Sequence, residues 1–422
     1  MIHAPKGIED VLPPRAASYA ELERKASELF ATYGYELIRI PTLEKTELFV
    51  RSVGSETDVG KQMYTFEDKG GRSLSLRPEG TAGVARAYVE HKLYGSAKTW
   101  GVYYCGSMFR YERPQAGRLR EFYQIGVEMF GESNLWVDAE VIQMASRFFE
   151  QIGLRGVEVV INSIGCPECR RKYIEALKHF LEGRIDSFCS DCQRRFQYNP
   201  LRILDCKKPG CREQLHHAPM ITEYLCSKCA QAFSEVQENL GVLNVSFKHD
   251  DRLVRGLDYY TGTIFEVVAP QLGAQSTVCA GGRYDGLVEQ LGGPATPALG
   301  FALGVERVLI ALTSEVEDGS QGRNDGVFFA TMGKEAIALA ARLASATRLQ
   351  GITSVVNLQK RSLSTQLRHA VKDGYSWVFV IGEQEVKAGK YTLKDMQSGN
   401  QLSVGEQDMG RLPRFLKEAR GQ

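Results

Sequence analysis

One stretch of twenty residues, FRYERPQAGRLREFYQIGVE (109–128), constrains the fold more than any other. It carries four arginines and three glutamates around a Pro-Gln-Ala-Gly turn at 114–117. After the turn, the apolar residues share one parity: Tyr123, Ile125, Val127 and Met129. The opposite parity carries Gln124, Gly126 and Glu128, and before the turn Arg110 and Glu112 also share a parity. This pattern predicts two antiparallel strands with one face on a core and the other face lined by arginine, glutamine and glutamate.

The size and composition of the chain are those of a multidomain globular protein. Its 422 residues predict about three domains at roughly 150 residues each. The net charge of +1 neither implies nor excludes a nucleic-acid partner, which would need a local basic patch. The N-terminus lacks an apolar targeting segment, and no apolar run is long enough to cross a bilayer. We therefore expect a cytoplasmic protein whose ten cysteines are reduced.

The first three quarters of the chain predict an antiparallel sheet surrounded by helices. Helical spacing and turn signals give the following elements in order: a helix over 15–33, a strand over 35–41, a hairpin turning at 68–71, a helix over 81–91, hairpins over 100–130 and 253–283, and a strand leading into a helix over 300–312. The region 166–229 differs because it is cysteine-rich, basic and rich in predicted loops.

The C-terminal part predicts a separate domain. A polar, glycine-containing linker is expected at 316–325. Beyond it, strand and helix patterns alternate, with helices expected over 334–349 and 362–372, which favours a small α/β domain with a partly parallel sheet. From Asp325 onward, fourteen Lys and Arg stand against nine Asp and Glu, a net charge of +5, so this domain holds the excess basic charge.

Several segments combine charge with glycine at expected strand ends: RPEGT (77–81), LVRGLDYYTG (253–262) and AGGRYDG (280–286). Arg110, Arg255 and Arg307 all lie beside apolar residues, so we expect them to be buried. A buried guanidinium needs an anion, and its geometry suits carboxylate or phosphate oxygens. Because the chain has no Walker-type glycine loop, a nucleotide would have to be held by arginines on a sheet. The alternative is that these arginines and glutamates only neutralise one another.

These motifs resemble those of a known family. FRYERPQAGR resembles motif 2 of the class II aminoacyl-tRNA synthetases, GFALGVERVLI resembles motif 3, and 15–41 resembles motif 1. LVRGLDYYTGTIFE and AGGRYDGL resemble the two signature peptides of the histidyl-tRNA synthetases, and RPEGTAG completes the set. The resemblance covers nearly the whole chain.

The resemblance implies an α+β catalytic domain, built on a six-stranded antiparallel sheet flanked by helices, with a small insertion and a C-terminal α/β anticodon-binding domain. The expected bounds are 1–160 and 241–315 for the catalytic domain, 161–240 for the cysteine-rich insertion and 326–422 for the anticodon-binding domain. Motif 1 implies a homodimer.

The resemblance also assigns roles to individual residues. The catalytic arginines would be Arg255 and Arg110. The ATP contacts would be Arg110, Glu112, Arg118, Arg120 and Arg307, and the histidine contacts Glu79, Thr81, Gln124, Glu128, Tyr260 and Tyr284. Arg113 and Gln115 would face the tRNA acceptor end. Attack of a carboxylate on the α-phosphorus brings two anions together, so positioned arginines and Mg²⁺ suffice as a catalyst.

The activity implied is that of a histidine–tRNA ligase, with L-histidine, ATP, Mg²⁺ and tRNA(His) as partners. A first alternative is a synthetase-like regulatory subunit of ATP phosphoribosyltransferase; those proteins usually lack the C-terminal domain and degrade the ATP motifs. A second alternative is a zinc-ribbon nucleic-acid module on an inert scaffold, which leaves the 109–128 stretch unexplained.

Eight of the ten cysteines form four close pairs: Cys166 and Cys169, Cys189 and Cys192, Cys206 and Cys211, Cys226 and Cys229. Pairs at this spacing in a reducing compartment favour structural Zn²⁺, and eight thiolates could close two sites or one site with spare cysteines. The order along the chain does not give the pairing, and free thiols are the alternative. The remaining Cys105 and Cys279 lie in strand-like contexts, where we expect buried, small hydrophobic residues.

Overall fold

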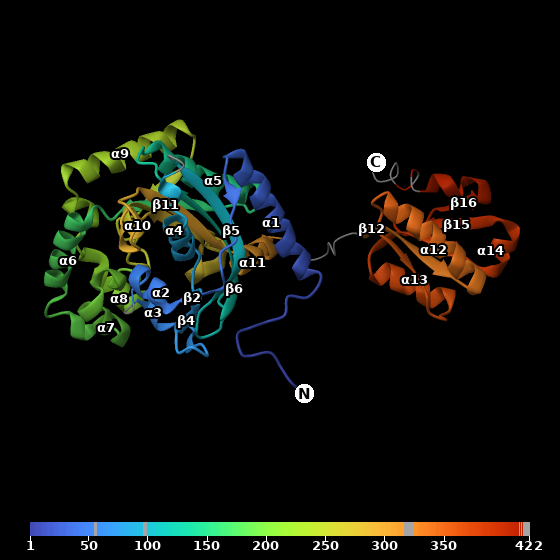
Figure 1. Cartoon of the computed structure of the whole chain (residues 1–422), viewed down its shortest axis with the longest axis horizontal. Helices are drawn as coiled ribbons and strands as arrows, with labels where there is room; N and C mark the ends of the chain where they lie inside the picture. The colour runs from blue at the N-terminus through green and yellow to red at the C-terminus, as the bar shows by residue number, and fades with distance from the viewer. Residues whose placement is uncertain (55–56, 96–98, 316–323, 413, 415, 417–422) are drawn as a thin grey trace. The chain divides into compact units, whose positions relative to one another are not determined.

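The computed structural model describes residues 1–54, 57–95, 99–315, 324–412, 414 and 416. The chain forms two compact units, 1–317 and 318–422, and the cysteine-rich segment belongs to the first (Figure 1). Most of the predicted linker, 316–323, lies outside the described residues. Asn324 and Asp325, expected in that linker, instead open the first strand of the second unit. None of the described helices is long and apolar enough to cross a membrane.

The first unit is built on an eight-stranded sheet. Its strands, in spatial order, are β1 (Glu36–Leu37), β5 (Trp100–Phe109), β6 (Glu121–Phe130), β11 (Ala298–Gly304), β10 (Thr277–Arg283), β9 (Thr261–Val268), β7 (Glu158–Ser163) and β8 (Phe247–His249). The six central strands pair antiparallel, which confirms the predicted sheet, whereas β1 and β8 add short parallel pairs at the two edges.

Two local strand predictions were too long. The strand expected over 35–41 reduces to Glu36–Leu37, because only these residues pair with β5 in register. The second strand-rich block begins at Thr261 rather than at residue 253, since 253–260 forms a loop that carries Arg255. The hairpin expected to turn at 68–71 is present between β3 (Thr65–Glu67) and β4 (Ser73–Leu76), and β2 (Leu43–Lys45) completes a separate three-stranded sheet.

Helices cover both faces of the large sheet. One core cluster packs helices on the first face: α1 (Arg15–Thr32), α5 (Trp136–Ile152), α9 (Ser227–Val242) and α11 (Val305–Glu315). A second cluster packs elements on the other face: α4 (Thr81–Glu90), α6 (Pro167–Leu181), α7 (Ser190–Tyr198), the 3₁₀ turn η3 (Pro200–Ile203), α8 (Pro209–Gln214) and α10 (Leu287–Gln290). The short helices α2 (Thr46–Ser52) and α3 (Asp58–Lys61) lie between β2 and β3 in the sequence.

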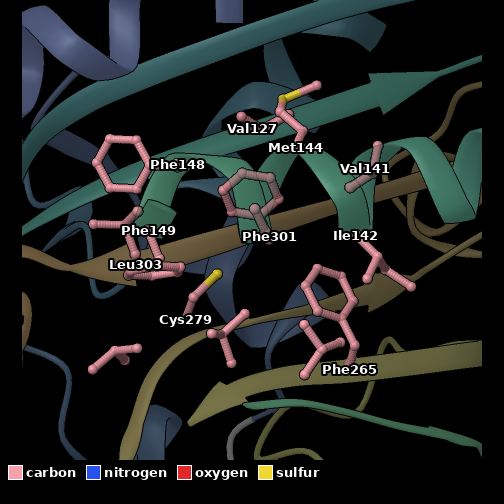
Figure 2. Packing of buried hydrophobic residues seen from close by; sticks show 14 of the residues in the cluster. Val127, Val141, Ile142, Met144, Phe148, Phe149, Phe265, Cys279, Phe301 and Leu303 are labelled. Carbon is pink, nitrogen blue, oxygen red and sulfur yellow. The ribbon is translucent and has the colours of Figure 1, made fainter. Parts of the chain in front are cut away.

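The alternation in β6 decides which face receives which side chains. Ile125 and Val127 are fully buried in the first cluster, as their parity predicts. Figure 2 shows Met144, Phe148 and Phe149 of α5 over the strands that carry Val127, Phe265, Phe301 and Leu303. Burying one such phenylalanine stabilises the fold by roughly 1.5–3 kcal/mol relative to leaving it exposed. This packed layer supports the sheet from one side, so Gln124 and Glu128, at the alternate positions of β6, lie on the opposite face.

The second unit is the predicted small α/β domain. Its sheet has the order β13 (Ser354–Val356), β12 (Asn324–Thr331), β14 (Tyr375–Ile381), β15 (Lys390–Asp395) and β16 (Gln401–Gly405). The first three strands are parallel and the last two pair antiparallel. The helices are α12 (Lys334–Leu349), α13 (Leu363–Lys372) and α14 (Glu383–Ala388). Helices α12 and α13 contribute to different core clusters, so both faces of the sheet are covered.

A buried ion pair joins β10 to α5 in the first unit. The Arg283 guanidinium donates to both carboxylate oxygens of Asp138, with distances of 2.6 Å from Nη2 and 2.9 Å from Nε. The Asp138 side chain is only 1% exposed and that of Arg283 6%. Arg283 belongs to AGGRYDG, so this part of the signature holds the fold together.

Replacing Asp138 with alanine should destabilise the first unit by about 3–5 kcal/mol, because Arg283 would be left as a buried charge without its anion. Chemical denaturation followed by fluorescence measures the change. The matched control is Arg24→Ala, which removes an exposed pairing with Glu21 and Glu28 on α1 and should shift the midpoint little. Equal shifts in the two variants would contradict the structural role of the buried pair.

Candidate active site

A cavity of about 350 Å³ opens on the polar face of the large sheet. It brings together ten of the predicted site residues: Glu79, Thr81, Arg110, Glu112, Arg118, Gln124, Arg255, Tyr260, Tyr284 and Arg307. These residues come from segments up to 228 positions apart in the sequence, and the antiparallel order β5-β6-β11-β10-β9 places them side by side. The 109–128 stretch therefore forms part of the floor of a cavity.

Two arginines in this cavity, Arg110 and Arg307, are half-buried and have no carboxylate partner among the described residues. The Arg110 guanidinium donates from Nε to the Pro78 carbonyl at 2.9 Å and lies 5.1 Å from the centre of the Phe122 ring. The Arg307 guanidinium donates to the carbonyls of Gly117 at 3.2 Å and Thr277 at 3.0 Å. Burial lowers the pKa of both arginines. Neither forms an ion pair with a described residue, so mutual neutralisation does not account for them.

Arg255 is held differently. Its guanidinium forms an ion pair with Glu266 and lies 5.7 Å from the centre of the Tyr260 ring. Burial is the largest effect on the pKa of Arg255 and lowers it, but Glu266, Tyr260 and Tyr259 together raise the pKa above its ordinary value. The second oxygen of Glu266 accepts a hydrogen bond from the Thr277 hydroxyl at 2.7 Å. Arg255 is therefore a fixed, permanently charged group.

Unused hydrogen-bonding atoms mark where a ligand would bind. The buried atoms Gln124 Oε1, Arg255 Nε and Tyr104 Oη have no hydrogen-bond partner among the described residues, and all three side chains line the cavity. Other such atoms, including Tyr35 Oη and Asn239 Nδ2, lie away from it. Because buried polar atoms in native proteins are nearly always satisfied, the three in the cavity are candidates for contact with a ligand.

A buried polar cluster lies behind the cavity wall. Glu128 is only 1% exposed; it accepts hydrogen bonds from the Thr81 hydroxyl at 2.6 Å and from the Tyr284 hydroxyl. Burial raises the pKa of Glu128 to about 8 despite these donors. A Cβ on Gly300 would lie 2.1 Å from the Glu128 carboxylate, so only glycine fits at this point of β11. Glu128 itself is not among the residues lining the cavity.

Glu79 is tied to the beginning of α4. Its two carboxylate oxygens accept the backbone N–H groups of Thr81 at 2.7 Å and Ala82 at 2.8 Å. These are N–H groups that a helix leaves unpaired in its first turn. Burial nevertheless raises the pKa of Glu79. The helix thus fixes a carboxylate at the cavity wall.

Besides Glu128, three predicted residues lie outside the cavity wall: Arg120, Arg113 and Gln115. The Arg120 guanidinium lies over the Tyr111 ring, 4.0 Å from its centre, and donates to the Glu112 carbonyl at 3.2 Å. Arg113 and Gln115 are exposed in the β5–β6 loop, where Gln115 pairs with Arg118 in an isolated β-bridge.

Several cavity residues were not identified from the sequence. Tyr104 of β5 fills space that is open only because Gly80 and Gly126 have no side chains, since a Cβ on either would lie 2.2 Å from its ring. Tyr104 shares the even parity of Arg110 in this stretch, and that shared parity is the sequence feature that could have identified it. Glu266 also shares a signature peptide with Arg255. The insertion contributes Arg202, Asp205 and Lys207, and no sequence pattern indicated that these residues line the cavity.

Two aspartates of the signature peptides have structural contacts, and of the two lone cysteines Cys279 is buried as expected whereas Cys105 is half-buried. Asp258 accepts a hydrogen bond from Asn199 at 2.7 Å, and Asp285 accepts one from the Ala298 backbone at 3.0 Å, so both hold loops in place. Cys279 is 1% exposed in the first core cluster, and Cys105 packs against that cluster.

The raised pKa of Glu128 makes stability depend on pH. Its pKa of about 8 in the folded chain lies above the ordinary 4.5. The folded state therefore binds the proton more tightly than the unfolded state, and this contribution is lost as the pH rises through 8. The Tm of Glu128→Gln relative to wild type should increase between about pH 5 and about pH 9. Glu175→Gln, on the exposed part of α6, serves as the control and should show no such trend. A trend of the opposite sign would contradict the assignment.

Known proteins resemble this chain along nearly its whole length. The family model for histidyl-tRNA synthetase matches residues 7–178 and 208–308, and the model for the anticodon binding domain matches 326–418. The histidine--tRNA ligase of Natranaerobius thermophilus is 47% identical over 403 residues, 95% of this chain and 96% of the relative. That of Trichlorobacter lovleyi is 50% identical over 400 residues, 94% of each chain. The crystal structure of apo S. aureus histidyl-tRNA synthetase superposes with a TM-score of 0.80 at 38% identity, covering 99% of this chain and 100% of that one. The chain belongs to the histidyl-tRNA synthetase family.

Proposed function

We propose that this chain is a histidine–tRNA ligase, which activates L-histidine with ATP and transfers the histidyl group to the 3′ end of tRNA(His). One observation carries the proposal. Two half-buried arginines without carboxylate partners among the described residues, Arg110 and Arg307, line the same cavity as Thr81 and Tyr284, which hydrogen-bond Glu128. An anion and a small polar molecule would be bound side by side there. The 47% identity to a histidine--tRNA ligase along 95% of the chain supports the same conclusion.

The arginines would perform the activation step. A histidine carboxylate oxygen attacks the α-phosphorus of ATP, the bond to the bridging oxygen breaks, and pyrophosphate leaves with that oxygen. Arg110 and Arg255 would stabilise the negative charge on the α-phosphate oxygens, while Arg307 and Arg118 would hold the far end of the triphosphate. Because these groups are fixed before ATP binds, they need no reorganisation as the charge develops.

The polar cluster would select histidine. Glu128 keeps its proton up to about pH 8, so it could donate to an imidazole nitrogen or accept the ring N–H in its ionised form. Tyr260 and Tyr284 would contact the same ring, and Gln124 would use its free Oε1 to orient the substrate. Glu79 and Thr81 would hold the α-amino group.

Magnesium fits this site. The carboxylates of Glu112 and Glu266 line the cavity and provide the oxygen ligands that Mg²⁺ prefers. When bound with ATP, the ion would offset phosphate charge. Glu112 is 3.5 Å from Arg118, and both oxygens of Glu266 are already hydrogen-bonded, so Glu112 has more freedom to turn toward a metal ion.

The remaining partners follow from the rest of the chain. The β5–β6 loop, with exposed Arg113 and Gln115, would meet the tRNA acceptor end, and the basic second unit would bind the anticodon stem. A homodimer is proposed through the motif 1 region, where Leu37 is an exposed apolar residue. Leu43 and Phe66 of the three-stranded sheet are exposed as well. Because charging takes place where tRNA and ATP are found, we propose a cytoplasmic location.

The regulatory-subunit alternative is disfavoured by two features. The motif arginines are retained and line one cavity, and a complete second unit follows the first. Histidine-dependent exchange of labelled pyrophosphate into ATP tests the proposal directly, because a regulatory subunit or a nucleic-acid module would not catalyse it. Absence of exchange in folded protein supplied with histidine, ATP and Mg²⁺ would refute it.

Replacing Arg255 with alanine should slow adenylate formation by roughly 10²–10³-fold, because one fixed positive charge on the developing transition state is lost. The dissociation constant for histidine should change far less. Single-turnover kinetics measure the first quantity and calorimetric titration the second. Arg171→Ala, an exposed arginine of α6, is the matched control. A near-normal exchange rate in the Arg255 variant would show that Arg255 has no catalytic role.

A further inference from the structure

Eight cysteines of the first unit gather into two groups that the sequence order did not reveal. One group joins Cys166 and Cys169 with Cys226 and Cys229, and the other joins Cys189 and Cys192 with Cys206 and Cys211. Within each group the sulfur atoms all lie within 4.8 Å of one another. All eight are free thiols.

The spacing of the sulfur atoms suits one small metal ion in each group. Four thiolates in a tetrahedron about Zn²⁺, with Zn–S bonds of about 2.3 Å, stand about 3.8 Å apart. The Cys166 and Cys169 sulfurs are 3.5 Å apart, and those of Cys189 and Cys206 are 4.0 Å apart. A multi-iron cluster would need a wider arrangement of ligands.

Backbone geometry around the sulfurs also favours thiolates. The N–H of Cys226 donates to the Cys169 sulfur at 3.1 Å, and the N–H of Cys189 donates to the Cys211 sulfur at 3.4 Å. Cys166, Cys189 and Cys226 are the N-cap residues of α6, α7 and α9, so the positive ends of these helix dipoles lie beside the sulfur atoms. Both features stabilise negative charge on sulfur.

We propose that each chain binds two structural zinc ions, one in each group of four cysteines. The first ion ties the beginning of α6 to the beginning of α9, two helices that 45 residues of insertion separate in the sequence. The second ion joins α7 to α8 and to the segment that precedes α8, all within the insertion (Figure 1). Only spatial proximity distinguishes this pairing from the other combinations of the four cysteine pairs.

The second site has a specific task. Cys206 is flanked in the sequence by Asp205 and Lys207, and both of these side chains line the active-site cavity. Fixing Cys206 to a metal therefore fixes the backbone on either side of it. None of the residues adjacent to the first group lines the cavity. The second zinc ion thus fixes residues of the cavity wall directly. The first acts on the wall through Arg170, which follows Cys169 and donates to the Asp258 carbonyl at 2.9 Å.

The ions are not needed to supply a core for the insertion. Its apolar residues Leu177, Ile203 and Leu215 are buried in the same cluster as Val102 and Tyr104 of the large sheet. A zinc ion here therefore has a local role and does not substitute for a hydrophobic core. Loss of either metal should loosen a segment without unfolding the first unit.

Metal analysis of full-length protein purified without chelators tests the two sites. Wild type should contain two zinc ions per chain, and mercurial titration of its thiols should release both. Cys226→Ser and Cys189→Ser should each retain one, while Cys105→Ser, a cysteine outside both groups, should retain two. Fewer than one zinc per chain in wild type, or iron in its place, would overturn the proposal. The metal count does not depend on the proposed function.

The positioning role needs a second measurement, which rests on the proposed function. Cys189→Ser should lower kcat/KM for pyrophosphate exchange about tenfold or more, because small displacements of an active-site wall are costly. Cys226→Ser should lower it by a smaller factor, because the first ion acts on the wall only through Arg170. Equal losses in the two variants would refute the positioning role while leaving the two zinc sites in place.

Discussion

A guanidinium removed from water loses its hydration, and the protein must replace that hydration with acceptors or with an anion. Arg110 and Arg307 receive backbone carbonyls but no carboxylate among the described residues. Their charge is therefore only partly offset in the free protein. A bound triphosphate would offset the remaining charge, so we expect anion binding to stabilise this cavity.

The large sheet makes this arrangement possible. Its apolar face packs on α1, α5, α9 and α11, so its polar face can carry charged residues without loss of the core. Arg283 and Asp138 fasten β10 to α5 with a buried pair, which keeps the strand that leads to Tyr284 in place. The same antiparallel order that builds the core thus sets the distances between substrate-binding groups.

Local patterns predicted much of this structure. The parity of 123–129 gave both faces of β6, and the period of apolar residues gave α12 with its observed bounds. Motif resemblance collected ten residues that line one cavity. What could not be predicted depends on packing between distant segments. The stacking of Arg120 on Tyr111 and the cavity position of Lys207 arise from contacts that no short pattern records. The pairing of cysteines belongs to the same class.

Tyr104 occupies room that two glycines leave open, one at the beginning of α4 and one on β6. Mutations at Tyr104 and mutations at the two glycines would therefore change the size of this pocket in different ways. Shortening this one ring would enlarge the pocket, whereas a methyl group at either glycine would collide with the ring. The size of the pocket is thus set by a single buried side chain, for which the two glycines make room.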